Sequence, residues 1–191
     1  FWGDKRKWES MKFKARVIED VRKFHKEFWG DRLVNPGSIQ WTLSAIYIAG
    51  NHGVDLQPQA GSAVWERVPP SLATEDCDNG WGYVYRSEDI LPAMSTKVLP
   101  MMHVWCFDPL KKEIVDFSCA DQVKLCDEWV SKPPPGVIWG RVGHYPRAFY
   151  QHDDEALRLA SVAAYILLRD RGEELGILDM GDTLQKMGFG D

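Results

Sequence analysis

Three polar residues of this chain, Ser38, His103 and Asp116, have types and spacings that suit acyl-transfer chemistry. Ser38 follows an Asn-Pro-Gly turn (35–37) and precedes apolar residues at helical spacing, so we expect it to cap the start of a helix that ends near Gly50. There the helix dipole and the free backbone N–H groups favour negative charge on a nucleophile or an oxyanion. The alternative is that Ser38 only caps the helix, which is a common role of serine.

Two alternating segments, 101–107 and 112–118, predict a β-hairpin whose loop is Asp108-Pro109-Leu110-Lys111. With that loop, His103 and Asp116 are direct cross-strand neighbours, with Cβ atoms about 4.5–5.5 Å apart. A slip of one residue would separate them. A carboxylate so placed can bind one imidazole nitrogen, at about 2.6–3.2 Å, and orient the other toward a nucleophile. The alternative is an exposed His–Asp pair on a sheet face.

Together these segments resemble the transglutaminase-like superfamily, whose members share a papain-like Cys-His-Asp core. The matching features are the helix start at Ser38, the helix end at 53–54, a strand around 61–65, the His103-Val104-Trp105 strand and the 114–118 strand that carries Asp116. The resemblance covers about residues 33–120. It implies an α+β, papain-like fold with a central helix packed on an antiparallel sheet and flanking helices. It also implies catalytic roles for Ser38, His103 and Asp116.

Position 38 departs from the family, which has Cys there. A thiol ionises far more readily than a hydroxyl, so Ser38 is either a true nucleophile, part of a degenerate binding site, or a deliberate replacement of Cys. Two functions follow from the resemblance. One is a cysteine-type hydrolase or acyltransferase acting on an amide or thioester, with Ser in the nucleophile position. The other is a catalytically inactive binding module that uses the same cleft. A serine hydrolase elbow is disfavoured, because Gly37-Ser38 lacks the second glycine.

The composition and net charge of the chain limit the classes of partner that we expect. The chain has 191 residues, 45% of them hydrophobic, and a net charge of -5, which argues against a general nucleic-acid binder. No apolar run approaches the ~18 residues of a membrane span. We therefore expect a peptide, protein or small acyl substrate, no nucleic acid, no membrane and no cofactor or metal, and we leave the oligomeric state open. The four cysteines form no CxxC pair and fit a reduced, cytoplasmic protein, and Cys106 faces away from His103 as a core residue.

We expect a single domain over residues 1–191, built on the core at about 33–120. An amphipathic helix at 8–28 precedes that core, and a helical part at 120–191 follows it. Within these limits the sequence predicts strands at 54–67 and 81–85 and helices at 120–130, 153–171 and about 180–187.

Overall fold

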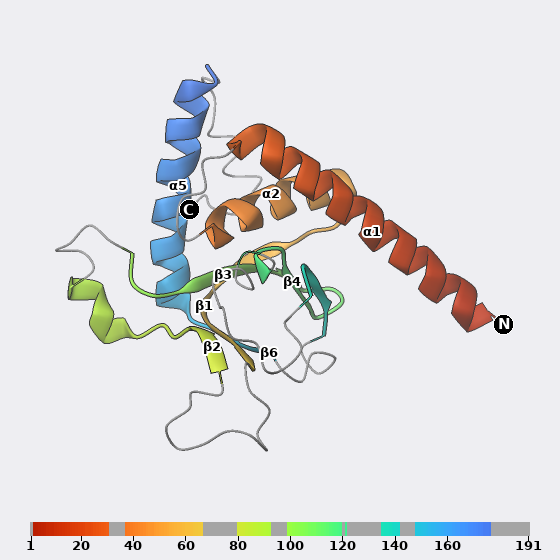
Figure 1. Cartoon of the computed structure of the whole chain (residues 1–191), viewed down its shortest axis with the longest axis horizontal. Coiled ribbons are helices and arrows are strands. Elements are labelled where there is room, and N and C mark those ends of the chain that lie inside the picture. Colours follow the sequence, from red (N-terminus) through yellow and green to blue (C-terminus); the bar gives the residue numbers. More distant parts are fainter. Residues whose placement is uncertain are drawn as a thin grey trace.

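A computed structural model of the chain describes residues 2–30, 37–66, 80–92, 99–119, 121, 135–141 and 148–176. The described elements form an α+β fold in which helices pack on an antiparallel sheet (Figure 1). The predicted helices at about 180–187 and, apart from Asp121, at 120–130 lie outside the described residues. Within the described part, no helix is both long enough and apolar enough to cross a membrane.

The sheet is centred on strand β1 (Gln57–Glu66). Its strand order is β2-β1-β3-β4-β5, and β6 also pairs with β1, always antiparallel. The other strands are β2 (Gly80–Tyr83), β3 (His103–Asp108), β4 (Glu113–Asp116), β5 (Ile138–Gly140) and β6 (Ala148–His152). Strands β3 and β6 pair with successive parts of β1, and both His103 and His152 lie opposite Gly61.

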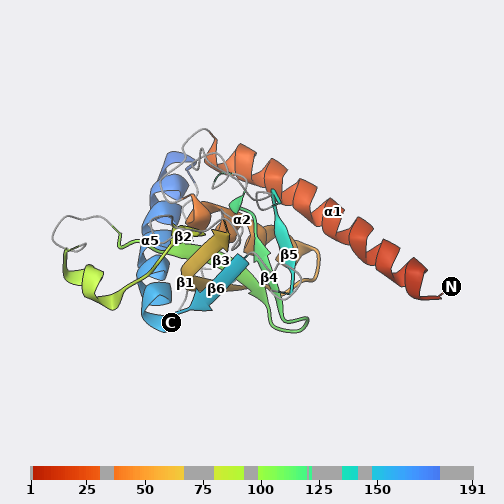
Figure 2. The same cartoon turned by 60° about the horizontal axis from the view of Figure 1, so that its bottom comes forward.

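Three long helices cover one face of this sheet (Figures 1 and 2). They are α1 (Trp2–Trp29), α2 (Ser38–Asn51) and α5 (Asp154–Glu174). The core that they share with the sheet includes Val21 of α1, Leu43 of α2, Val104 of β3 and Ala160 of α5. A second cluster of buried residues packs apart from these helices and consists of Ala63, Trp65, Trp105, Ile114, Cys119 and Ile138. Because side chains alternate along a strand, Trp105 and Val104 point to opposite faces.

The three helices confirm the predicted periodicities. Helix α5 begins after Asp153, whose carboxylate accepts hydrogen bonds from the backbone N–H groups of Glu155 and Ala156. Helix α1 is longer than expected. Its buried stripe contains Val17 and Val21, whereas Trp8 and Met11, at the start of the expected amphipathic helix, are exposed.

The segment after residue 120 differs from the prediction of a helical part, because it contributes β5 and β6 to the sheet. Strand β5 has three residues, fewer than an alternating pattern needs, and β6 has five residues of which none is fully buried, so neither shows a clear hydrophobic alternation. Their partners are β4 and β1, both distant in the sequence. No local pattern of residues indicates either pairing.

Candidate active site

The hairpin of β3 and β4 forms with a register two residues away from the predicted one. Cys106 lies opposite Val115 and Asp108 opposite Glu113, so the loop is 109–112 and not 108–111. Asp108 Oδ1 accepts hydrogen bonds from the N–H groups of Leu110 and Lys111 at 3.0 Å each, and Lys112 takes a left-handed conformation with φ +56°. His103 and Asp116 are thus diagonal and not directly opposite, but a shift of two residues leaves both on the same face.

His103 and Asp116 form the predicted hydrogen bond. His103 Nε2 lies 2.8 Å from Asp116 Oδ2, within the expected range. The two residues are 0% and 1% exposed, so the alternative of an exposed pair on a sheet face is wrong. The pair lies inside the protein, where a charge interaction is screened less than at the surface.

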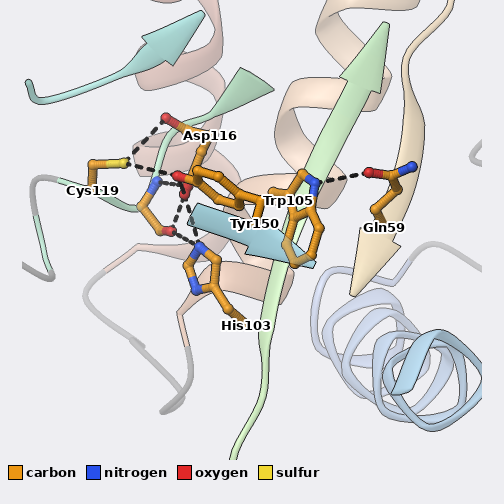
Figure 3. A network of polar contacts seen from close by, with 7 residues as sticks. Gln59, His103, Trp105, Asp116, Cys119 and Tyr150 are labelled. Carbon is orange, nitrogen blue, oxygen red and sulfur yellow. Dashed lines mark hydrogen bonds and ion pairs between the residues drawn. The ribbon is translucent and has the colours of Figure 1, made fainter. Parts of the chain in front are cut away.

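Two further residues donate to the Asp116 carboxylate. Ser118 donates to Oδ1 through its backbone N–H at 2.9 Å and its hydroxyl at 2.7 Å. The Tyr150 hydroxyl donates to Oδ2 at 2.8 Å, so Oδ2 serves both Tyr150 and His103 (Figure 3). Burial by itself would raise the pKa of Asp116, but His103 and these hydrogen bonds outweigh it and lower the pKa to about 2. Asp116 is therefore a carboxylate at neutral pH.

Aromatic rings enclose the imidazole of His103. Tyr83 and Trp105 lie nearly parallel to it, with ring centroids 5.6 and 6.1 Å away, and Trp65 meets it edge-on at 5.2 Å. Trp105 is held in turn by a 2.9 Å hydrogen bond from its Nε1 to Gln59 Oε1 (Figure 3). These rings limit the orientations open to His103 by packing.

Ser38 lies in the first turn of α2, as expected, but it is not the N-cap. Gly37 occupies that position, and no side chain caps the helix there. Ser38 is fully buried, and its Oγ has no hydrogen-bond partner among the described residues. His103 Nδ1 is likewise buried without a partner in the described part of the chain. The two atoms are not hydrogen-bonded to each other, so the structure joins His103 to Asp116 but does not join Ser38 to His103.

The first turns of α2 nevertheless lie against the hairpin that carries His103 and Asp116. Cys106 Sγ contacts the Thr42 carbonyl oxygen at 3.6 Å, and the Trp41 and Phe117 rings stack with centroids 6.2 Å apart. Both contacts involve side chains on the sheet face opposite to that of His103, since Cys106 and Phe117 belong to the core beneath the helices. Ser38 lies one helical turn before Thr42 in α2.

The described cysteines are core residues. Burial and the charge of Asp116 raise the pKa of the Cys106 and Cys119 thiols well above the ordinary value, so neither is an activated nucleophile. This confirms the expectation for Cys106. No cluster of three potential metal ligands occurs among the residues that the structure describes.

Sequence reasoning missed Ser118 and Tyr150. Ser118 follows Asp116 by two residues, so strand alternation put it on the same face and was an available signal. Tyr150 is 34 residues from Asp116 along the chain, and its role depends on the pairing of β6, which the sequence did not indicate. Comparisons with protein-family models, with curated proteins and with solved structures find no match to this chain.

Proposed function

We propose that this protein is a transglutaminase-like hydrolase or acyltransferase that acts on an amide or thioester of a peptide, protein or small acyl substrate, with residue 38 as nucleophile. The observation that carries the proposal is the buried 2.8 Å hydrogen bond between His103 Nε2 and Asp116 Oδ2, which leaves His103 Nδ1 without a partner among the described residues. An imidazole fixed at one nitrogen by a carboxylate presents the other as a general base. The proposal includes the papain-like arrangement of the fold and a cytoplasmic location.

In the proposed reaction, the Ser38 oxygen attacks the substrate carbonyl carbon while its proton passes to His103 Nδ1. Asp116 stabilises the imidazolium that forms, as a carboxylate hydrogen-bonded to Nε2 does. His103 then returns the proton to the leaving amine or thiol as the bond to the carbonyl carbon breaks, and an acyl-enzyme remains. Water or an acceptor amine releases the acyl group by the same steps. Backbone N–H groups at the start of α2 are suited to hold the oxyanion.

The absence of a hydrogen bond between Ser38 and His103 favours the second function, an inactive binding module. A hydroxyl needs a base within hydrogen-bond reach, and here Ser38 Oγ and His103 Nδ1 are not bonded. Catalytic hydrogen bonds are often long in the free protein and tighten only with substrate, so this geometry leaves the enzyme as the first proposal. The binding module follows if Ser38 serves only the packing of α2.

The variant Ser38→Cys tests the proposal. A helix N-terminus favours the thiolate, and so does the imidazolium that the proposal makes its partner, so the pKa of the new thiol should fall below the free value of about 8.5. The titration can be followed by the ultraviolet absorbance of the thiolate, which does not require access for a reagent. Alkylation by iodoacetamide at about pH 6 should then be faster at residue 38 than at the other cysteines, because the thiolate is the reactive form.

The matched control is the double variant Ser38→Cys/His103→Ala, which should lose most of this reactivity because the cationic partner is gone. Cys106 and Cys119 serve as internal references for thiols whose pKa burial raises. If the new thiol titrates like these two, and His103→Ala changes nothing, the site lacks an activating geometry. The binding module would then replace the enzyme.

A further inference from the structure

Tyr150 contacts the candidate site from outside the segment, about 33–120, that the resemblance covers. It lies on β6, which reaches the site by pairing with β1. Its hydroxyl donates to Asp116 Oδ2 at 2.8 Å, the same oxygen that His103 Nε2 contacts at 2.8 Å. Its ring packs against Trp105, with centroids 5.1 Å apart.

We infer that Tyr150 is a positioning residue, which holds the Asp116 carboxylate so that Oδ2 stays directed at His103. The inference rests on the proposed function for its catalytic meaning. Ser118 fixes Oδ1 with two hydrogen bonds, and Tyr150 supplies a donor to Oδ2 besides His103. With both oxygens bound on separate sides, the carboxylate cannot rotate away from the imidazole without breaking a buried hydrogen bond, which is costly.

Tyr150 also tunes the strength of the pair. Two donors on one carboxylate oxygen share its negative charge, so the Tyr150 hydroxyl weakens the pull of Oδ2 on the His103 N–H. The phenol remains a neutral donor, because burial and the charge of Asp116 raise its pKa well above the ordinary value. Other titratable groups recorded near the pair are Tyr83 of β2, Cys106 of β3 and Cys119 after β4. From β1 the described neighbour is Trp65, which does not titrate in this range.

The test is Tyr150→Phe, which keeps the ring and removes only the hydroxyl. By carboxyl NMR, the midpoint of the Asp116 titration should rise by about one pKa unit, since a donor to the charged form is lost. At neutral pH the His103 Nε2–H proton should move downfield, because its hydrogen bond to Oδ2 strengthens. Tyr83→Phe is the matched control. It removes a hydroxyl from another ring that packs on His103, and it should leave both signals within a small fraction of these shifts.

A second variant works in the opposite direction. Replacing Tyr150 with 3-fluorotyrosine gives a stronger donor in the same place, so the Asp116 midpoint should fall and the Nε2–H proton should move upfield. Unchanged signals in both Tyr150 variants would overturn the inference, and so would equal shifts in Tyr83→Phe. The Asp116 midpoint and the Nε2–H signal do not depend on turnover, whereas the reactivity of Ser38→Cys tests the proposed function. A failure of the inference on Tyr150 can therefore be distinguished from a failure of the proposed function.

Discussion

Asp116 keeps a negative charge inside the protein, and that charge links its stability to pH. Its pKa in the folded protein is about 2, below the ordinary 3.8, so the folded state binds a proton less readily than the unfolded chain. The resulting stabilisation is fully present above about pH 4 and is lost as the pH falls from about 4 through 2. A shift of this size corresponds to about 2 kcal/mol.

Asp116→Asn should remove this part of the acid destabilisation. We expect the free energy of unfolding of the wild type, measured by urea denaturation, to fall by about 2 kcal/mol more than that of Asp116→Asn between pH 4 and pH 2. Asp55→Asn, which changes an exposed carboxylate, is the control and should follow the wild type. Parallel curves for wild type and Asp116→Asn would show that the His103–Asp116 bond does not hold the charge.

At this scale the sequence predicted the pair but not its surroundings. Alternation along two short strands was enough to place His103 and Asp116 on one face, even though the loop was assigned one residue early, which changes the register by two residues. The error was harmless because strand side chains repeat every two residues. Ser38 was placed correctly in the first turn of α2, but the cap moved to Gly37. No local sequence pattern specifies the distance between Ser38, at the start of α2, and His103, at the start of β3.

At the scale of elements, α1 and α2 are joined by a buried polar cluster centred on Ser44. The Ser44 hydroxyl donates to the Gln40 carbonyl oxygen at 2.9 Å and accepts from Trp29 Nε1 at 3.1 Å. His25 Nδ1 lies 3.1 Å from the same oxygen, and the His25 ring stacks on Trp41 with centroids 3.5 Å apart. Because the hydroxyl proton goes to Gln40, His25 donates to Ser44 through Nδ1, and burial keeps the imidazole neutral at neutral pH.

This cluster should make the packing of α1 on α2 sensitive to mild acid. Burial lowers the pKa of His25 from 6.5 to about 4, although Asp121 and the backbone of Gln40 act in the other direction. The unfolded chain binds the proton first, so stability is complete above about pH 6.5 and is lost as the pH falls toward 4. The loss amounts to about 3 kcal/mol.

His25→Asn tests this, because an amide can donate to Ser44 but does not titrate. Its free energy of unfolding, from chemical denaturation at pH 7 and pH 4.5, should change with pH by about 2 kcal/mol less than that of the wild type. His52→Asn leaves the cluster intact and should retain the wild-type loss that arises from His25. A wild-type protein equally stable at both pH values would contradict the expectation.

The helices were predictable and two strands were not, for a physical reason. Helices α1 and α5 bury one stripe each, and that stripe is visible in the local sequence. Helix α2 is buried on most of its surface, and the turn before it and its apolar residues at helical spacing mark it in the sequence. Strand β6 has five residues, of which none is fully buried, so it carries little hydrophobic pattern. Strand β6 pairs with residues 61–65 of β1, starting at Gly61, where the part of β1 that pairs with β3 ends. This pairing depends on the assembled sheet and not on the local sequence of β6.

At the scale of the whole molecule, β1 is the central strand, with which three other strands pair. It pairs with β2, β3 and β6, and Gly61 lies where β3 gives way to β6. The next residues after β6 are tied to β1 as well, because the Asp153 N–H donates to the Ala60 carbonyl oxygen at 2.9 Å immediately before α5. The position of Tyr150 beside Asp116 therefore depends on close approach of two backbones at Gly61.

Gly61→Ala should disrupt this junction. Gly61 has φ +149°, a conformation that L side chains rarely adopt, and an added Cβ would overlap the backbone carbonyl oxygen of Gln151. Backbone cannot yield as a flexible side chain does, so we expect the variant to lose about 3 kcal/mol or more of unfolding free energy in urea denaturation. Tyr150 should also move from Asp116, raising the Asp116 titration midpoint as Tyr150→Phe does.

Gly50→Ala is the matched control, since nothing lies within 4 Å of its added Cβ in α2, and it should stabilise the protein by up to about 1 kcal/mol. A Gly61→Ala protein as stable as Gly50→Ala would mean that β6 does not pack on β1 as closely as described.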